Sequence, residues 1–275
     1  MTPEPELRDQ PSQRPDDAAV DTSELPFVAP CRSLAWNEPL GWIRLGVADL
    51  QAAPRPSLFY GCLFAALGAG IAGLTWRYGL LALYMGLASG FVFLGPLLAM
   101  GLYSISYQLG EGRRPTLAYS LQVGRSHIRD TLVLGLCLLV VLLVWARAAT
   151  LMAVFRPMDA FPSWRDLIPY MGIGTVVGAI FSAVIFAATA FSLPMLLERR
   201  VDAITAVVTS INASLRNKPA MLVWGAIIVT CVLIGFATLC LGFIVLMPVL
   251  GHATWHAYRR TIDSSDWPPT HTGGG

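Results

Sequence analysis

Apolar residues in this chain gather in long, almost uncharged stretches, each long enough to meet the roughly 18-residue requirement of a membrane-spanning helix. Polar segments separate them. The last stretch, Pro219 to Tyr258, holds 40 residues without Asp, Glu, Lys or Arg. As one helix it would extend about 60 Å, which is too long for a single crossing. It therefore predicts two spans with a turn near 238–242.

The pattern predicts an all-α integral membrane protein with six transmembrane helices. We expect a membrane domain at 34–260, a disordered cytoplasmic tail at 1–33 and a flexible cytoplasmic tail at 261–275, because both tails are polar. No apolar segment precedes Ser57, so no cleavable signal peptide is expected. The expected spans are about 57–76, 80–107, 131–155, 168–197, 219–237 and 239–258.

The basic residues predict the orientation of these spans. With six crossings, 15 of the 19 Lys and Arg residues fall on one side and only Arg77, Arg147, Arg156 and Arg165 fall on the other. The positive-inside rule places the richer side, with both termini, in the cytoplasm. Arg147 lies near the outer end of its span, where its side chain can reach the headgroups.

The amino-acid composition agrees with a membrane protein and indicates which kinds of partner to expect. The chain is 55% hydrophobic and 13% charged, whereas a soluble domain carries about 25% charged residues. A net charge of +2 does not indicate a nucleic-acid partner. The expected partner is the lipid bilayer, with anionic lipids held by the basic cytoplasmic segments.

An internal repeat is visible in the positions of three prolines. Pro96, Pro194 and Pro248 lie in the second, fourth and sixth expected spans, and similar apolar residues flank each of them. A polar stretch with helical apolar spacing precedes each odd-numbered span, which is typical of an amphipathic surface helix. The hypothesis is three parallel repeats, each a surface helix plus two spans, with the prolines as possible helix breaks. Similar composition of all membrane helices is the alternative explanation. The apolar positions of the three surface helices are Leu40, Ile43, Val47, Leu50; Leu117, Leu121, Ile128; and Ile204, Val207, Val208, Ile211, Leu215.

Four motifs carry a resemblance to a known family. They are FLGPLLAMGLY (93–103), FSLPMLL (191–197), VDAITAVVTS (201–210) and PVLGHATWHAYRR (248–260). Together they resemble the DUF2189 family of bacterial integral membrane proteins over roughly 34–260. The resemblance implies the bacterial inner (cytoplasmic) membrane as the location and brings no known activity.

His252 and His256 are the candidate metal-site residues. The i, i+4 spacing places both imidazoles on one helix face, where a metal ion or haem is one use for them. Ala253, Thr254 and Trp255 lie between them, so the glutamate of a zinc-protease helix is missing. The alternative is that both histidines form the polar cytoplasmic end of the last span and bond to backbone or lipid phosphate. No cofactor is predicted on this second interpretation.

Several function classes remain open, and no catalytic constellation is present. Parallel repeats and proline-bearing spans favour a small-solute transporter or channel-like carrier, with Thr189 and Ser192 beside Pro194 as possible lining residues. Surface helices and a free tail favour a membrane scaffold or an assembly partner of a complex such as a respiratory one, either alone or as a homo-oligomer. Metal or haem binding through His252 and His256 is the third alternative.

Overall fold

The computed structural model describes residues 26–79, 81–126, 128–152 and 164–270, and the remainder of both predicted tails lies outside these ranges. Within them the chain is helical and holds isolated bridges but no strand, so the all-α prediction is confirmed. The helices are α1 (Glu38–Ala52), α2 (Pro54–Tyr78), α3 (Leu81–Gly110), α4 (Leu117–Ser126), α5 (Ile128–Met152), α6 (Trp164–Thr189), α7 (Ser192–Glu198), α8 (Ala203–Arg216), α9 (Lys218–Ala237) and α10 (Phe243–Thr261).

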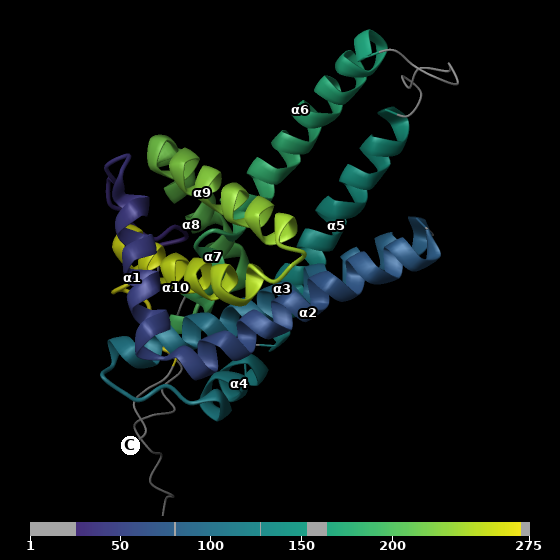
Figure 1. Ribbon diagram of the computed structural model, residues 1–275. Coiled ribbons are helices and arrows are strands. Elements are labelled where there is room, and N and C mark those ends of the chain that lie inside the picture. Colours follow the sequence, from purple (N-terminus) through teal and green to yellow (C-terminus); the bar gives the residue numbers. More distant parts are fainter. Residues whose placement is uncertain (1–25, 80, 127, 153–163, 271–275) are drawn as a thin grey trace, which may run out of the picture.

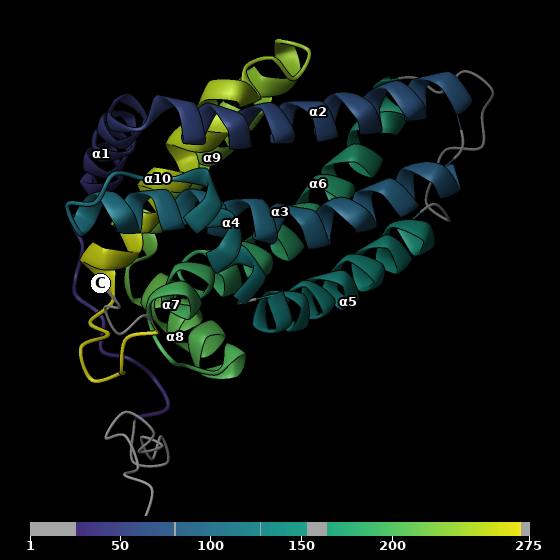
Figure 2. The same cartoon turned by 90° about the horizontal axis from the view of Figure 1, so that it is seen from below.

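Helix α10 lies at the centre of the packed part of the molecule. It packs against α1, α2 and α3, and more lightly against α7 and α9. The long helices converge toward α1, α7 and α10 and diverge at their other ends, where α5 and α6 project away from the rest (Figure 1). The perpendicular view shows the same divergence and places α2 alongside α3 (Figure 2).

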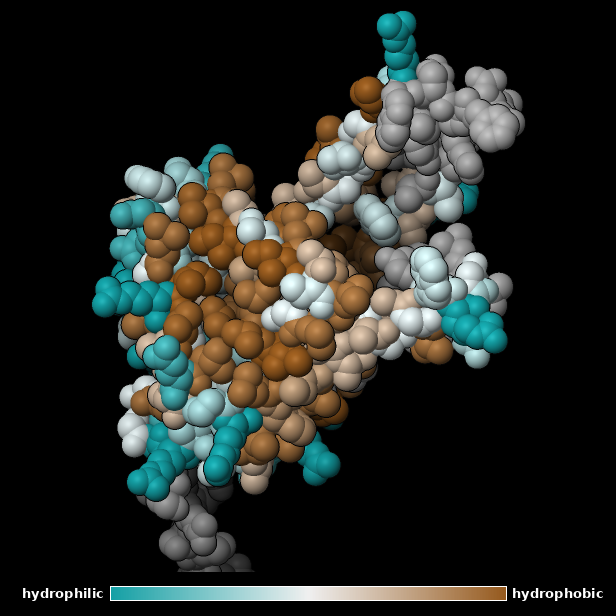
Figure 3. All heavy atoms as spheres, viewed as in Figure 1, coloured by the Kyte–Doolittle hydropathy of each residue, from teal (hydrophilic) through white to brown (hydrophobic). Residues whose placement is uncertain are grey.

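Four stretches of the described chain are long and apolar enough to cross a membrane: Pro54–Tyr78, Thr131–Ala148, Met171–Glu198 and Lys218–Ala237. Between 17% and 22% of the residues in each window are buried, so most of their apolar side chains face outward. Apolar surface covers much of the molecule in Figure 3, with hydrophilic residues gathered along the edge that carries α1. An exterior of this kind suits lipid as the solvent.

Close backbone contacts hold α10 against its neighbours. A Cβ atom added at Gly61 of α2 would collide with the carbonyl group of Ile244, and one added at Gly46 of α1 would lie 2.6 Å from the carbonyl oxygen of Val249. Only glycine leaves room for backbones at this distance, as is common where helices pack inside membranes. These two glycines therefore set how closely α1 and α2 approach α10.

The helices α1, α4 and α8 each expose part of their predicted apolar line, although α1 buries Trp42 and α4 buries Val123. On α8, Ala206, Ser210 and Ala213 are buried, whereas Ile204 and Leu215 from the predicted apolar line are exposed. On α1 and α4, Leu40 and Leu121 are likewise exposed. The apolar line of each helix therefore includes residues that face outward, as expected for a helix lying at a lipid interface.

The three prolines differ in their effect on the helices. Pro96 lies inside α3 and Pro248 inside α10, and both helices run through them. The chain breaks only before Pro194, where α6 ends at Thr189 and α7 begins at Ser192. Ser210 of α8 bonds backbone groups at this break. Its hydroxyl accepts a hydrogen bond from the Phe191 N–H at 3.0 Å and donates one to the Ala187 carbonyl at 2.7 Å.

The described inner parts of both predicted tails, residues 26–33 and 261–270, are packed against the helices. Cys31 pairs with Ile262 in an isolated antiparallel bridge, and the Ala29 N–H donates to Thr209 Oγ1 of α8 at 3.1 Å. Trp267 is 2% exposed. The physical reason is that each segment supplies backbone partners to the other and covers the end of the helix cluster, which local composition does not reveal.

Candidate functional site: a row of polar side chains along α10

His252 of α10 is fully buried. Its Nε2 lies 2.9 Å from Ser57 Oγ of α2, and its Nδ1 lies 2.8 Å from Ser106 Oγ of α3. A neutral imidazole has one donor and one acceptor nitrogen, and each hydroxyl can take either role, so both bonds form with either tautomer. The imidazole thus links three helices.

His256 lies one turn further along α10 and bonds to a different helix. Its Nε2 is 2.8 Å from Asp49 Oδ2 of α1, and both side chains are largely buried, at 24% and 15% exposure. Arg260, another turn on, donates to Glu38 Oε2 of α1 at 3.2 Å. Successive turns of α10 are therefore tied to both ends of α1.

Glu198 forms the third polar centre, at the junction of α7 with the C-terminal end of α10. The Tyr258 hydroxyl donates to Glu198 Oε2 at 2.6 Å, and the Arg259 guanidinium contacts Oε1. Ser264 Oγ lies 2.9 Å from the tyrosine oxygen and 3.3 Å from the carboxylate. Arg199 Nε is 3.5 Å from the same carboxylate. Two guanidinium groups thus accompany a carboxylate whose side chain is 7% exposed, as a buried charge requires.

This arrangement ties helices together, and its geometry is that of a structural network. Both ring nitrogens of His252 are engaged by hydroxyls, and His256 is directed to Asp49, so the predicted pair does not point at a shared position. In the part of the chain that is described, no group of three or more His, Cys, Asp and Glu residues is placed to hold a metal ion. Metal or haem binding at His252 and His256 stays a prediction.

Of the other two candidate residues, Thr189 is bonded within its own helix and Ser192 has no side-chain bond among the described residues. Thr189 Oγ1 donates to the Ile185 carbonyl at 2.8 Å, which is a bond within its own helix. Ser192 Oγ is buried without a partner among the described residues. At the helix break beside Pro194, Ser210 bonds one backbone N–H group and one backbone carbonyl group.

Sequence reasoning found the two histidines and missed their partners. Ser57, Ser106 and Asp49 have nothing in their neighbourhood that marks them, because they come from three helices far from residue 252 in sequence. Glu198 carried one signal: it is an acidic residue directly at the end of a long apolar stretch, next to two arginines. Such a position commonly indicates an exposed charge, and only the packing of Tyr258 and Ser264 encloses it.

Comparison with known proteins also indicates an integral membrane protein. A family model described as a predicted integral membrane protein (DUF2189) matches residues 83–198, which run from α3 through α7. Two of the four motifs of the resemblance, 93–103 and 191–197, lie inside this match. No curated protein and no solved structure matches the chain.

Proposed function

We propose that this chain, an integral membrane protein whose residues 83–198 match the DUF2189 family, is a six-span membrane scaffold that assembles with other membrane helices. The location we propose is the bacterial inner membrane, with both termini in the cytoplasm. The observation that carries the proposal is the divergence of α5 and α6 from the packed part of the molecule.

The six-span topology adds α3 and α10 to the four apolar stretches. Helix α3 has 30 residues and α10 has 19, which at 1.5 Å per residue suffices for about 45 Å and about 29 Å. The apolar character of α10 is diluted by the polar residues that it turns toward α1, α2 and α3. Because those residues are bonded inside the protein, they do not oppose insertion of α10 beside its neighbours.

The order of the helices supports the three-repeat hypothesis. Short helices α1, α4 and α8 each precede a pair of longer segments, namely α2 and α3, α5 and α6–α7, and α9 and α10. Each second segment carries the proline of its unit. We propose that the chain was built from three copies of this unit.

Unpartnered faces on α6 support the assembly role. Small residues let membrane helices approach closely, yet among the described residues a Cβ atom added at Gly174 would meet no atom of another helix within 4 Å. Ile173 beside it and Met171, one turn earlier, are more than half exposed. A second helix laid against this face, from another protein or another copy of the chain, would use Gly174 as α10 uses Gly61.

A small-solute carrier is the competing function, and the centre of the packed region favours the scaffold. His252, Tyr60 and Leu102, where α2, α3 and α10 meet, are each at most 2% exposed. Side chains and their hydrogen bonds fill this position. A carrier would need a polar passage there.

Photo-crosslinking in cells tests the assembly role. A photoreactive residue at Ile173 on α6 is expected to give a discrete protein adduct, whereas one at the exposed Leu40 of α1 is expected to give lipid adducts. Gly174→Leu should abolish the protein adduct without changing the melting temperature of the isolated chain, because no other described helix comes within 4 Å of a Cβ atom placed there.

Two results together would overturn the scaffold. One is exclusive lipid labelling at Ile173. The other is a lone monomer after gentle solubilisation of native membranes. Uptake of a solute by the pure protein in liposomes would then favour the carrier.

A further inference from the structure

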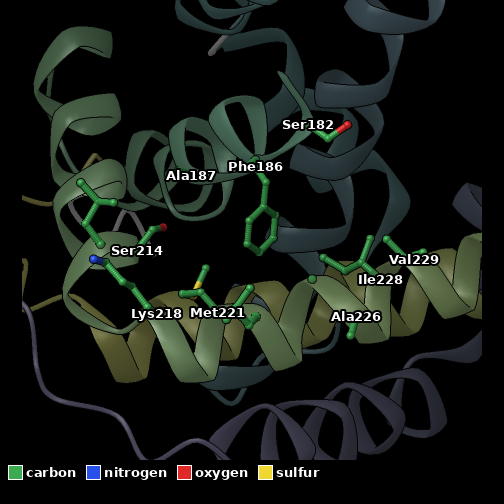
Figure 4. A pocket seen from close by; sticks show the side chains of 13 residues that line it. Ser182, Phe186, Ala187, Ser214, Lys218, Met221, Ala226, Ile228 and Val229 are labelled. Atoms are coloured by element: carbon green, nitrogen blue, oxygen red, sulfur yellow. The ribbon is translucent and has the colours of Figure 1, made fainter. Parts of the chain in front are cut away.

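A groove of about 580 Å³ lies between α6, α8 and α9. Its volume falls within the range of roughly 300–1,000 Å³ that small-molecule sites occupy. Its lining is almost entirely apolar, with a phenyl ring from α6 in the middle (Figure 4). Lining residues used below are Phe186, Ser214, Lys218, Met221, Gly225 and Val229.

One end of the groove is polar and cationic. Lys218 and Ser214 lie together there, whereas Val229 lies toward the other end (Figure 4). Among the residues that the structure describes, no carboxylate lies within ion-pair distance of Lys218. Ser214 is 6% exposed and its hydroxyl has no hydrogen-bond partner there. A buried hydroxyl without a partner is costly, so it is expected to bond to whatever fills the groove.

The length of the groove matches one leaflet of a bilayer. Lys218 is the first residue of α9 and Val229 lies eleven residues further on, a rise of about 16 Å. Half of a hydrocarbon core roughly 30 Å thick is about 15 Å. With Lys218 at the cytoplasmic interface, the groove reaches the middle of the membrane.

We propose that this groove binds one anionic phospholipid of the cytoplasmic leaflet. The lipid phosphate pairs with the Lys218 ammonium group, near the Ser214 hydroxyl, and one acyl chain lies along Met221, Gly225 and Val229 beneath Phe186. An amphiphile with a negative head and an apolar tail complements both ends of the groove. A second copy of the chain fits less well, because a symmetric contact here would bring Lys218 and Arg216 near the same cations of the partner.

Native mass spectrometry of the full chain, released from nanodiscs, tests this assignment with phosphatidylglycerol as the probe and phosphatidylcholine, whose headgroup is zwitterionic and carries no net charge, as the comparison. The protein should retain one phosphatidylglycerol molecule in preference to phosphatidylcholine. Lys218→Gln should weaken its retention roughly fivefold, the effect of one interfacial cation. Arg216→Gln is the matched control, because Arg216 belongs to the same interface but does not line the groove, and it should change retention less than twofold.

Filling the groove gives the second test. A Cβ at Gly225 would meet only Phe186, at 3.9 Å, so Gly225→Leu should fold with an unchanged melting temperature, occupy the acyl-chain position and abolish retention. Inorganic phosphate should not compete, which separates a lipid from a free anion.

Three outcomes would overturn the proposal. They are equal retention of both lipids, retention unaffected by Lys218→Gln and Gly225→Leu, and a dimer mass that Gly225→Leu removes. The last would assign the groove to a second copy of the chain.

Discussion

His252 shows how a single polar side chain can be accommodated within a helix cluster of this kind. Its two ring nitrogens join Ser57 and Ser106, and the imidazole is fully buried. Removing it would leave two buried hydroxyls without their partner and a cavity where the ring lies. Each effect destabilises the folded state.

We therefore expect His252→Ala to lower the free energy of unfolding by about 1–3 kcal/mol. His256→Ala should cost less than His252→Ala, because Asp49 and the position of His256 keep some contact with solvent, which can bond to the freed carboxylate. Thermal unfolding in detergent, followed by tryptophan fluorescence, measures both. Equal losses in the two variants would contradict the structural role of His252.

The same two variants decide the metal hypothesis. Elemental analysis and an optical spectrum of the purified protein, compared with the His252→Ala, His256→Ala double variant, give a direct result. A stoichiometric metal or haem signal lost in the double variant would establish binding at this pair. Its absence in both proteins would leave the hydrogen bonds to Ser57, Ser106 and Asp49 as the role of the histidines.

At the scale of the helices, packing of backbones decides where each element lies. Gly61 lets α2 approach the Ile244 carbonyl of α10, whereas Gly70 on the same helix has nothing within 4 Å. The two positions are alike in sequence, since both lie in one apolar stretch. Only the neighbouring helix distinguishes them.

Gly61→Ala is expected to destabilise the fold by about 1–3 kcal/mol, because the new methyl group must push α2 from α10. Gly70→Ala, the matched control, should be neutral or stabilising by up to about 1 kcal/mol through helix propensity. The melting temperatures of both variants in detergent provide the measurement. A Gly61→Ala protein as stable as the Gly70→Ala protein would show that α2 and α10 do not pack this closely.

At the scale of the whole molecule, the open question is how many helices cross the bilayer. The six-span proposal places Arg77 outside and both Arg113 and Ser265 in the cytoplasm. All three side chains are exposed, so a cysteine at any of them is open to a water-soluble reagent. A five-span protein would instead present Ser265 outside.

In a chain freed of its five native cysteines, Arg77→Cys should react with a membrane-impermeant thiol reagent added to intact spheroplasts. Arg113→Cys and Ser265→Cys should react only after the membrane is permeabilised. The reason is the excess of Lys and Arg on the cytoplasmic side. Labelling of Ser265→Cys in intact spheroplasts would refute the return crossing by α10.

The sequence by itself determined the class of protein and its all-helical character. Uncharged apolar stretches of membrane-spanning length need no tertiary information, because the bilayer sets their length and the backbone must bond within each segment. The alternation of short and long helical segments was likewise readable, as was the i, i+4 spacing of His252 and His256. What each of these residues contacts was not.

The tertiary structure decided which polar groups meet and which faces are buried. Glu198 and Tyr258 are 60 residues apart, and Ser210 bonds the helix break before Pro194 from another helix. On α8 the small and hydroxyl-bearing residues turn inward while Ile204 and Leu215 turn outward. The physical reason is that lipid makes an apolar exterior favourable, so hydropathy no longer separates inside from outside, and close packing with hydrogen bonds makes that distinction.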